Sequence, residues 1–258
     1  MNKKYFSENY HKFSTTLFLS MKVSRLASGR NTEWNKFWAC LLFTKLCVIG
    51  KSIHLIASDS ILDNKNSHWD FSSLFSLTRN IMECYQTMFY LCVDNIPDDE
   101  RLARKKLFDL HDYYEKKKLH SNLDDLEDKE LESYVVNELT TNKYFMSLEE
   151  KEQKKYLKGN QAFFKSREEI EELYGRSRKE FRALYQLFSS YTHSYPIGFY
   201  GMYDGERGTG VASETEIAYS GLALETTEWY LRQGAMHICI LFADIKKTLT
   251  EEEIEILK

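Results

Sequence analysis

The stretch DFSSLFSLTRNIMECYQTMFYLCV, residues 70–93, has the apolar spacing of an amphipathic helix. Asp70 is a favourable N-cap residue for such a helix, and the turn over residues 94–97 ends it. On a helical wheel its apolar side chains gather on one broad face, formed by Phe71, Leu74, Leu77, Ile81, Tyr85, Met88 and Cys92. The sequence therefore predicts a helix that packs this face against other helices.

The opposite stripe of this helix is polar but carries only one charge of each sign. Its members are Ser72, Ser76, Arg79, Asn80, Glu83, Gln86, Thr87 and Tyr90. This composition is typical of a cleft wall or of a polar seam between two helices. Arg79 and Glu83 are four residues apart, so the arginine can hold the carboxylate and still direct N–H groups at an anion such as phosphate. The alternative is an intrahelical salt bridge with no further role.

The rest of the chain indicates an all-α protein. Only two prolines and 11 glycines interrupt 258 residues, which suits a multi-helix bundle with long central helices and poorly suits a many-stranded sheet. Periodicity and capping residues predict further helices over residues 9–27, 32–59, 98–118, 147–158, 166–174, 176–191 and 214–247, and a short one from Thr250. The helix over 32–59, capped by Thr32, is apolar on nearly all sides, so we expect it at the centre of the bundle.

Residues 98–180 form a charged helical insertion or arm within a single helical domain over residues 1–258. Charges of both signs alternate there with sparse apolar residues, as in a solvated helical region. Two capping-box patterns, Ser147 with Glu150 and Ser166 with Glu169, predict separate helices within it.

Composition restricts the function classes. The formal net charge is -4, so nucleic-acid binding would need a local basic patch. The five cysteines show no metal-ligand spacing, so we expect no metal, no cofactor and a reducing, cytoplasmic setting. The N-terminus lacks the apolar stretch of a signal peptide. Lys45, Lys51 and His54 interrupt the apolar segment over 38–57, which favours a buried helix over a membrane span.

A second polar cluster, SSYTHSYP over residues 189–196, leads into a glycine-rich loop over residues 198–210. His193 can act there as a general acid or base near neutral pH. Alternatively, its ring satisfies the last carbonyls of the preceding helix. The glycine loop follows no strand and carries no Lys-Ser/Thr pair, which excludes a P-loop.

The two clusters together resemble a widespread bacterial all-helical family of unknown function. Its members carry an Arg-x-x-x-Glu motif in an early central helix and a Ser-x-x-His-x-x-Pro-like motif later, matched here by Arg79-x-x-x-Glu83 and by Ser190-x-x-His193-x-x-Pro196. The resemblance implies that Arg79, Glu83, Ser190 and His193 meet in space.

More distantly, the layout is similar to HEPN (higher eukaryote and prokaryote nucleotide-binding) domains, helical bundles that are common in toxin–antitoxin and phage-defence systems. Many of them are metal-independent ribonucleases in which an Arg precedes the active-site His by four to six intervening residues. Here Gln186, Leu187 and Phe188 occupy those positions and Arg182 is too far away, so the cation would come from Arg79 on another helix.

Two functions follow from these observations. In the first, the chain is a HEPN-like ribonuclease or nucleotide-binding effector. Arg79 then binds phosphate, Glu83 orients it, His193 handles a proton, and Tyr191 and Ser190 donate hydrogen bonds. In the second, which we favour, the chain is a helical binding protein. The same residues then form a satisfied network, and the arm over residues 98–180 engages a protein partner. By analogy with the families it resembles, the chain is expected to pair with such a partner or to form a homo-oligomer such as a homodimer.

Overall fold

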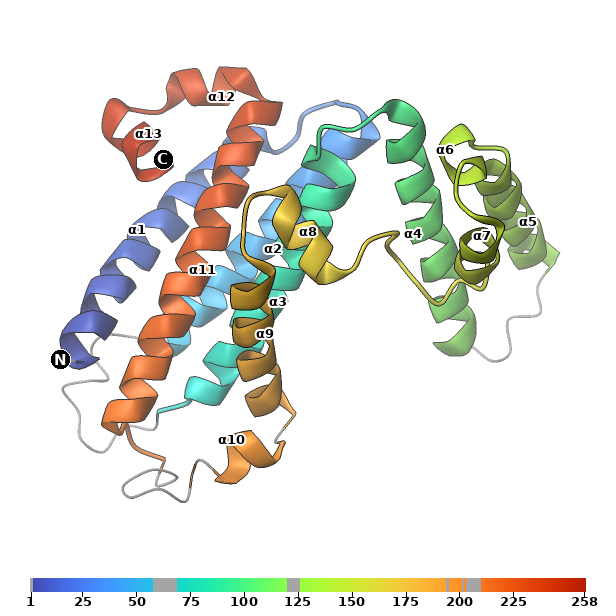
Figure 1. Cartoon of the computed structure of the whole chain (residues 1–258). Helices are drawn as coiled ribbons and strands as arrows, with labels where there is room; N and C mark the ends of the chain where they lie inside the picture. The colour runs from blue at the N-terminus through green and yellow to red at the C-terminus, as the bar shows by residue number, and fades with distance from the viewer. Residues whose placement is uncertain (1, 58–68, 120–125, 194, 201, 203–209) are drawn as a thin grey trace. The chain divides into compact units, whose positions relative to one another are not determined.

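The computed structural model describes residues 2–57, 69–119, 126–193, 195–200, 202 and 210–258, with residues 126–129 described by their backbone. Within these residues the chain is helical and contains no strand, which confirms the predicted all-α class (Figure 1). The helices divide into two compact units, residues 1–93 with 174–258 and residues 94–173.

The first unit is a bundle of long helices. Its α-helices are α1 (Asn2–Ala27), α2 (Trp34–Ile56), α3 (Phe71–Met88), α9 (Arg178–Thr192), α10 (Pro196–Tyr200), α11 (Glu214–Leu241), α12 (Ala243–Thr248) and α13 (Glu251–Ile256). The helix predicted from the opening stretch is α3, which Asp70 caps by accepting a hydrogen bond from the Ser73 amide. A single π-helical turn, Phe89–Val93, continues α3 to the predicted end.

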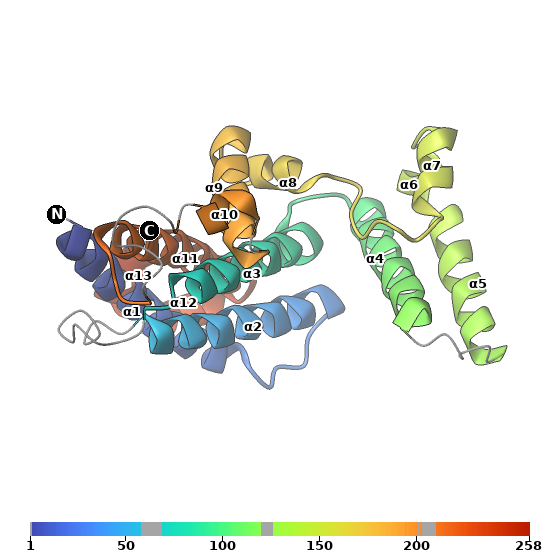
Figure 2. The same ribbon diagram turned by 90° about the horizontal axis from the view of Figure 1, so that it is seen from below.

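Helix α11 is the centre of this unit, because it packs against α1, α2 and α3 (Figures 1 and 2). A capping box in which Ser213 and Glu216 exchange hydrogen bonds starts the helix. Gly221 lets α1 approach closely, since a Cβ atom there would lie 2.7 Å from the Tyr5 ring. The predicted end at Lys247 is wrong, because Phe242 leaves helical geometry and separates α11 from α12.

The prediction that the helix over residues 32–59 lies at the centre of the bundle is wrong. This helix is α2, which begins at Trp34 after Glu33 without a side-chain cap, so Thr32 is not its cap. Its core face comprises Ala39, Phe43, Leu46, Cys47, Ile49, Gly50 and Ile53. The opposite face is apolar but exposed, and it carries Phe37, Leu41, Val48 and Leu55. The apolar composition of α2 predicted burial on all sides, but α1, α3 and α11 cover only one face of this helix.

Within the described part of the chain, α2 is also the one helix long and apolar enough to cross a membrane. One face of it contributes to the bundle core, as a helix of a folded domain does.

The second unit, Asp94–Leu173, contains α4 (Asp98–Leu119), α5 (Leu126–Thr140), α6 (Lys143–Met146), α7 (Glu150–Tyr156) and α8 (Arg167–Leu173). It has an apolar core of its own, made by Ala103, Leu107, Leu110, Val135, Leu139, Phe145 and Tyr156. Arg104 is fully buried in this unit, where Asp94 and Glu100 both pair with its guanidinium, at 2.8 and 2.6 Å. The charged segment over residues 94–173 is therefore a compact unit with its own apolar core, in addition to its solvated helix faces.

The two capping boxes predicted in this unit have different outcomes. Ser166 and Glu169 exchange backbone and side-chain hydrogen bonds at the start of α8, as predicted. The box of Ser147 with Glu150 is wrong. Ser147 ends α6 in helical geometry and its hydroxyl donates to the Tyr144 carbonyl, so α7 begins only after Glu149.

A buried histidine makes the first unit sensitive to pH. His237 on α11 is buried, the Tyr85 hydroxyl lies 3.2 Å from its Nδ1, and burial lowers the pKa of His237 to about 4. The unfolded chain binds a proton at this residue below about pH 6.5, whereas the folded chain does not until about pH 4. Stability is therefore complete above the unfolded pKa and falls as pH falls through this window.

We predict that lowering the pH from about 7 to about 5 costs wild type about 2 kcal/mol more unfolding free energy than it costs His237→Gln. Urea unfolding of both proteins at the two pH values measures this difference. His11→Gln, a change at an exposed histidine on α1, is the control and should behave as wild type. Equal losses in wild type and His237→Gln would contradict the assignment.

Candidate functional site

Arg79 joins α3 to α9 through three hydrogen bonds. Its Nε donates to Glu83 Oε1 at 3.1 Å, one turn further along α3. Its Nη2 donates to the Tyr185 hydroxyl at 3.0 Å, and its Nη1 lies 3.0 Å from His193 Nε2. The Tyr185 hydroxyl donates in turn to Glu83 Oε1 at 2.5 Å. We call these four residues the Arg79 cluster.

The polar stripe of α3 continues this contact along α9. The Ser76 hydroxyl donates to Thr192 Oγ1 at 3.0 Å, and the Ser72 hydroxyl donates to the Tyr191 carbonyl at 3.4 Å. The stripe is therefore a helix–helix seam over its first turns, and the Arg79 cluster lies along it. This arrangement explains why the stripe lacks lysine and dense charge.

The Arg79 cluster is half-buried rather than enclosed. The side chains of Arg79 and Glu83 are 23% and 29% exposed, and His193, the C-cap residue of α9, is exposed. Partial burial works against the charge of Arg79, but the hydrogen bond and charge of Tyr185, together with Glu83, outweigh it and raise the pKa of Arg79. The guanidinium is therefore a permanent cation that solvent and ligands can reach.

The contact between Arg79 and His193 assigns the donor and the acceptor of this hydrogen bond. A guanidinium has five N–H donors and no acceptor, so His193 Nε2 must accept. A hydrogen bond of this geometry requires the tautomer that carries its proton on Nδ1. Among the described residues, Nδ1 of His193 and two of the five N–H groups of Arg79 have no hydrogen-bond partner.

The structure thus brings together three of the predicted residues, Arg79, Glu83 and His193. Ser190 lies elsewhere, since its buried hydroxyl donates to the Gln186 carbonyl within α9. The Tyr191 ring packs in an aromatic cluster with Phe71, Phe75 and Tyr219. The placement of these two residues gives them roles in the packing of α9 against α3 and α11.

Tyr185 is the member of the cluster that sequence reasoning missed. It lies two turns before His193 on α9, just outside the segment 187–196 that carried the resemblance. Its ring also stacks with the Arg79 guanidinium, whose carbon lies 4.9 Å from the ring centroid. A helical wheel that included the whole of α9 would have placed Tyr185 near the face of Ser189 and His193.

The short helix α10 packs on the C-terminal end of α9, the end at which His193 lies. The Tyr195 amide donates to the Ser190 carbonyl, and a Cβ atom on Gly198 would lie 2.9 Å from that same carbonyl oxygen. Glycine at this position therefore lets α10 pack directly on the end of α9. Most of the predicted glycine loop, residues 201 and 203–209, lies outside the described residues.

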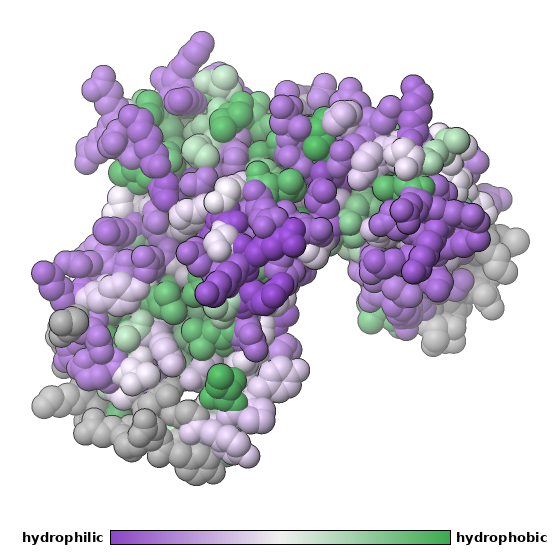
Figure 3. Space-filling view, viewed as in Figure 1, coloured by the Kyte–Doolittle hydropathy of each residue, from purple (hydrophilic) through white to green (hydrophobic). Residues whose placement is uncertain are grey.

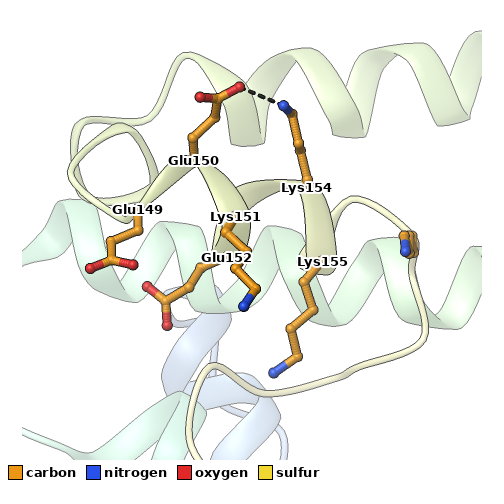
Figure 4. A pocket seen from close by; sticks show the side chains of 7 residues that line it. Glu149, Glu150, Lys151, Glu152, Lys154 and Lys155 are labelled. Atoms are coloured by element: carbon orange, nitrogen blue, oxygen red, sulfur yellow. Dashed lines mark hydrogen bonds and ion pairs between the residues drawn. The ribbon is translucent and has the colours of Figure 1, made fainter.

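One hollow in the surface of the second unit is lined by lysine and glutamate side chains. Its seven lining residues all come from the segment 149–158 around α7, and Figure 4 shows lysine and glutamate side chains there, with Lys154 paired to Glu150. The surface over α7 is hydrophilic (Figure 3), as expected of a solvated helix face. In the described part of the chain, no three His, Cys, Asp or Glu side chains gather closely enough to hold a metal ion.

The first unit is thus an all-helical bundle in which a half-buried Arg–Glu–Tyr–His cluster joins α3 to α9. Residues 36–209 match the model of a family described as Family of unknown function (DUF5677). The match covers more than half of the 258 residues, so the chain belongs to this family, and it includes the whole Arg79 cluster. No curated protein and no solved structure compared with the chain matches it. The resemblance to HEPN domains stays a prediction.

Proposed function

We propose that the chain is a helical binding protein whose Arg79 cluster captures a phosphate-bearing ligand. One observation carries this proposal: the Arg79–His193 hydrogen bond leaves Nδ1 of an exposed histidine and two guanidinium N–H groups directed at no other described residue. The guanidinium of Arg79 also carries a permanent positive charge at this point. Phosphate oxygens are acceptors that match such a set.

The remaining members of the cluster hold Arg79 in position. Glu83 accepts from the Nε edge of the guanidinium and from Tyr185, so its carboxylate is engaged away from the donors that remain. Tyr185 fixes the guanidinium plane through its ring and its hydroxyl. A side chain that is fixed before binding loses less conformational entropy when the ligand arrives.

The alternative is a metal-independent ribonuclease in which His193 handles a proton beside the phosphate. The 3.0 Å approach of the Arg79 guanidinium to the imidazole favours it. As a base, however, His193 would need its Nε2, which accepts from Arg79 in this arrangement. A toxin–antitoxin or phage-defence setting, which the HEPN resemblance implies, belongs with this alternative. We therefore rank binding above cleavage.

Titration calorimetry with inorganic phosphate and with pyrophosphate tests the proposal. We expect Arg79→Gln to weaken binding at least about tenfold, because a hydrogen bond to a charged group contributes about 1.5 to 3 kcal/mol. The matched control is Arg232→Gln on α11, where Arg232 also pairs with a glutamate four residues away, Glu228, at 3.2 Å. Equal affinity in both variants would contradict a phosphate site at Arg79.

The same preparations distinguish binding from cleavage. If wild type degrades RNA without added metal and His193→Ala does not, the ribonuclease alternative replaces simple binding. If RNA stays intact while phosphate still binds, the binding function stands.

We also propose that the exposed face of α2 pairs with a second copy of the chain. Leu41, Val48 and Leu55 repeat at heptad spacing, with Phe37 in line, and they are 51% to 68% exposed. Lys51 does not interrupt this seam, because its ammonium turns toward the Phe18 ring on α1. A second copy presents the same heptad spacing on its own α2. If the two α2 helices pair antiparallel about a two-fold axis between Leu41 and Val48, Leu41 of each copy faces Val48 of the other.

Sedimentation velocity measures this self-association. Wild type should sediment as a dimer and Leu41→Asp as a monomer, because a charge in an apolar seam is desolvated without a partner. The matched control is Leu131→Asp on α5, where the leucine is 51% exposed, against 53% for Leu41. A monomeric wild type, or a Leu41→Asp dimer of unchanged affinity, would contradict the proposal.

A further inference from the structure

Large aromatic side chains lie exposed beside the Arg79 cluster. Tyr195 is 56% exposed, and Phe199 and Tyr200 on α10 are 49% and 66% exposed. Soluble proteins normally bury most of the surface of such rings, and neighbouring exposed rings mark an interaction surface. We call these three residues the aromatic platform.

The platform is continuous with the proposed phosphate site. The Tyr195 ring centroid lies 5.5 Å from that of His193, and the rings of Phe199 and Tyr200 are 5.8 Å apart. The backbone fastens the platform to α9, since the Tyr195 amide donates to the Ser190 carbonyl, and the amides of Gly198 and Phe199 donate to the Tyr195 carbonyl. The Tyr195 ring therefore lies next to His193, and the backbone ties α10, with Phe199 and Tyr200, to the same end of α9.

We infer that the phosphate-bearing ligand is single-stranded nucleic acid, with a backbone phosphate at Arg79 and His193 and bases stacked on the aromatic platform. This inference rests on the proposed function and names its ligand. Every base offers a π-face to an aromatic ring, and cationic groups that follow the backbone beside stacking rings are the common features of single-strand binding. A duplex keeps its bases stacked on each other and offers these rings no face.

The charge of the chain fits a local contact of this kind. At a net charge of -4 the whole protein does not attract a polyanion, so affinity must come from a few phosphates together with stacking. An exposed apolar surface for a protein partner would need neither a cation nor a histidine donor at its edge. The platform has both at His193 and Arg79.

Fluorescence anisotropy with a labelled oligouridylate of about ten nucleotides tests the inference on the full chain, because one platform and its flanks hold about 4 to 16 nucleotides in comparable sites. We expect Tyr200→Ala to weaken oligouridylate binding roughly 5- to 150-fold and to leave the affinity for inorganic phosphate unchanged. Tyr200→Trp should retain binding, because it keeps a stacking face. Tyr134→Ala is the matched control, since Tyr134 is 55% exposed in the other unit.

The outcomes separate this inference from the proposed function. If inorganic phosphate binds at Arg79 but the oligouridylate binds no more tightly than phosphate, the nucleic-acid inference fails and the phosphate site stands. If Tyr200→Ala and Tyr195→Ala both bind the oligouridylate as wild type does, the platform is not used and the inference is overturned. If neither phosphate nor oligouridylate binds wild type, the phosphate site itself is absent.

Discussion

The burial of α11 among α1, α2 and α3 is the constraint on which the first unit depends. Burial of apolar side chains is the dominant favourable term in folding, and α11 buries residues such as Leu224, Leu231 and Ile238 along its whole length. Because the apolar face of α3 packs on α11, the polar stripe of α3 must face away from α11. The polar stripe packs against α9, and this contact joins residues that are more than 100 positions apart in the sequence.

The proposed phosphate site depends on this packing through Arg79. A guanidinium can only donate, so each of its neighbours must accept from it, and this requirement sets the tautomer of His193 and the engagement of Tyr185 and Glu83. Three N–H groups of Arg79 donate within the cluster, and its two remaining N–H groups donate to no described residue.

The sequence predicted much of this arrangement, and its errors have physical causes. The period of α3 is set by local side-chain spacing, so Asp70, the apolar face and the polar stripe were all visible in one stretch. The exposed face of α2 was not, because periodicity reports composition around a helix and not the number of its neighbours. Tyr185 was missed for a similar reason: its partner Arg79 lies on another helix, 106 residues away. Ser190 has the right residue type, but its hydroxyl is taken by its own helix.

Long-range proton–nitrogen NMR of the His193 imidazole is the most direct test of the central claim that Arg79 holds this histidine as a donor for a phosphate ligand. At mildly alkaline pH we predict the tautomer with the proton on Nδ1, and a change in the Nδ1 resonance when inorganic phosphate is added. Arg79→Gln should lose both effects. A proton on Nε2 in wild type, or an Nδ1 resonance that phosphate does not move, would contradict the account.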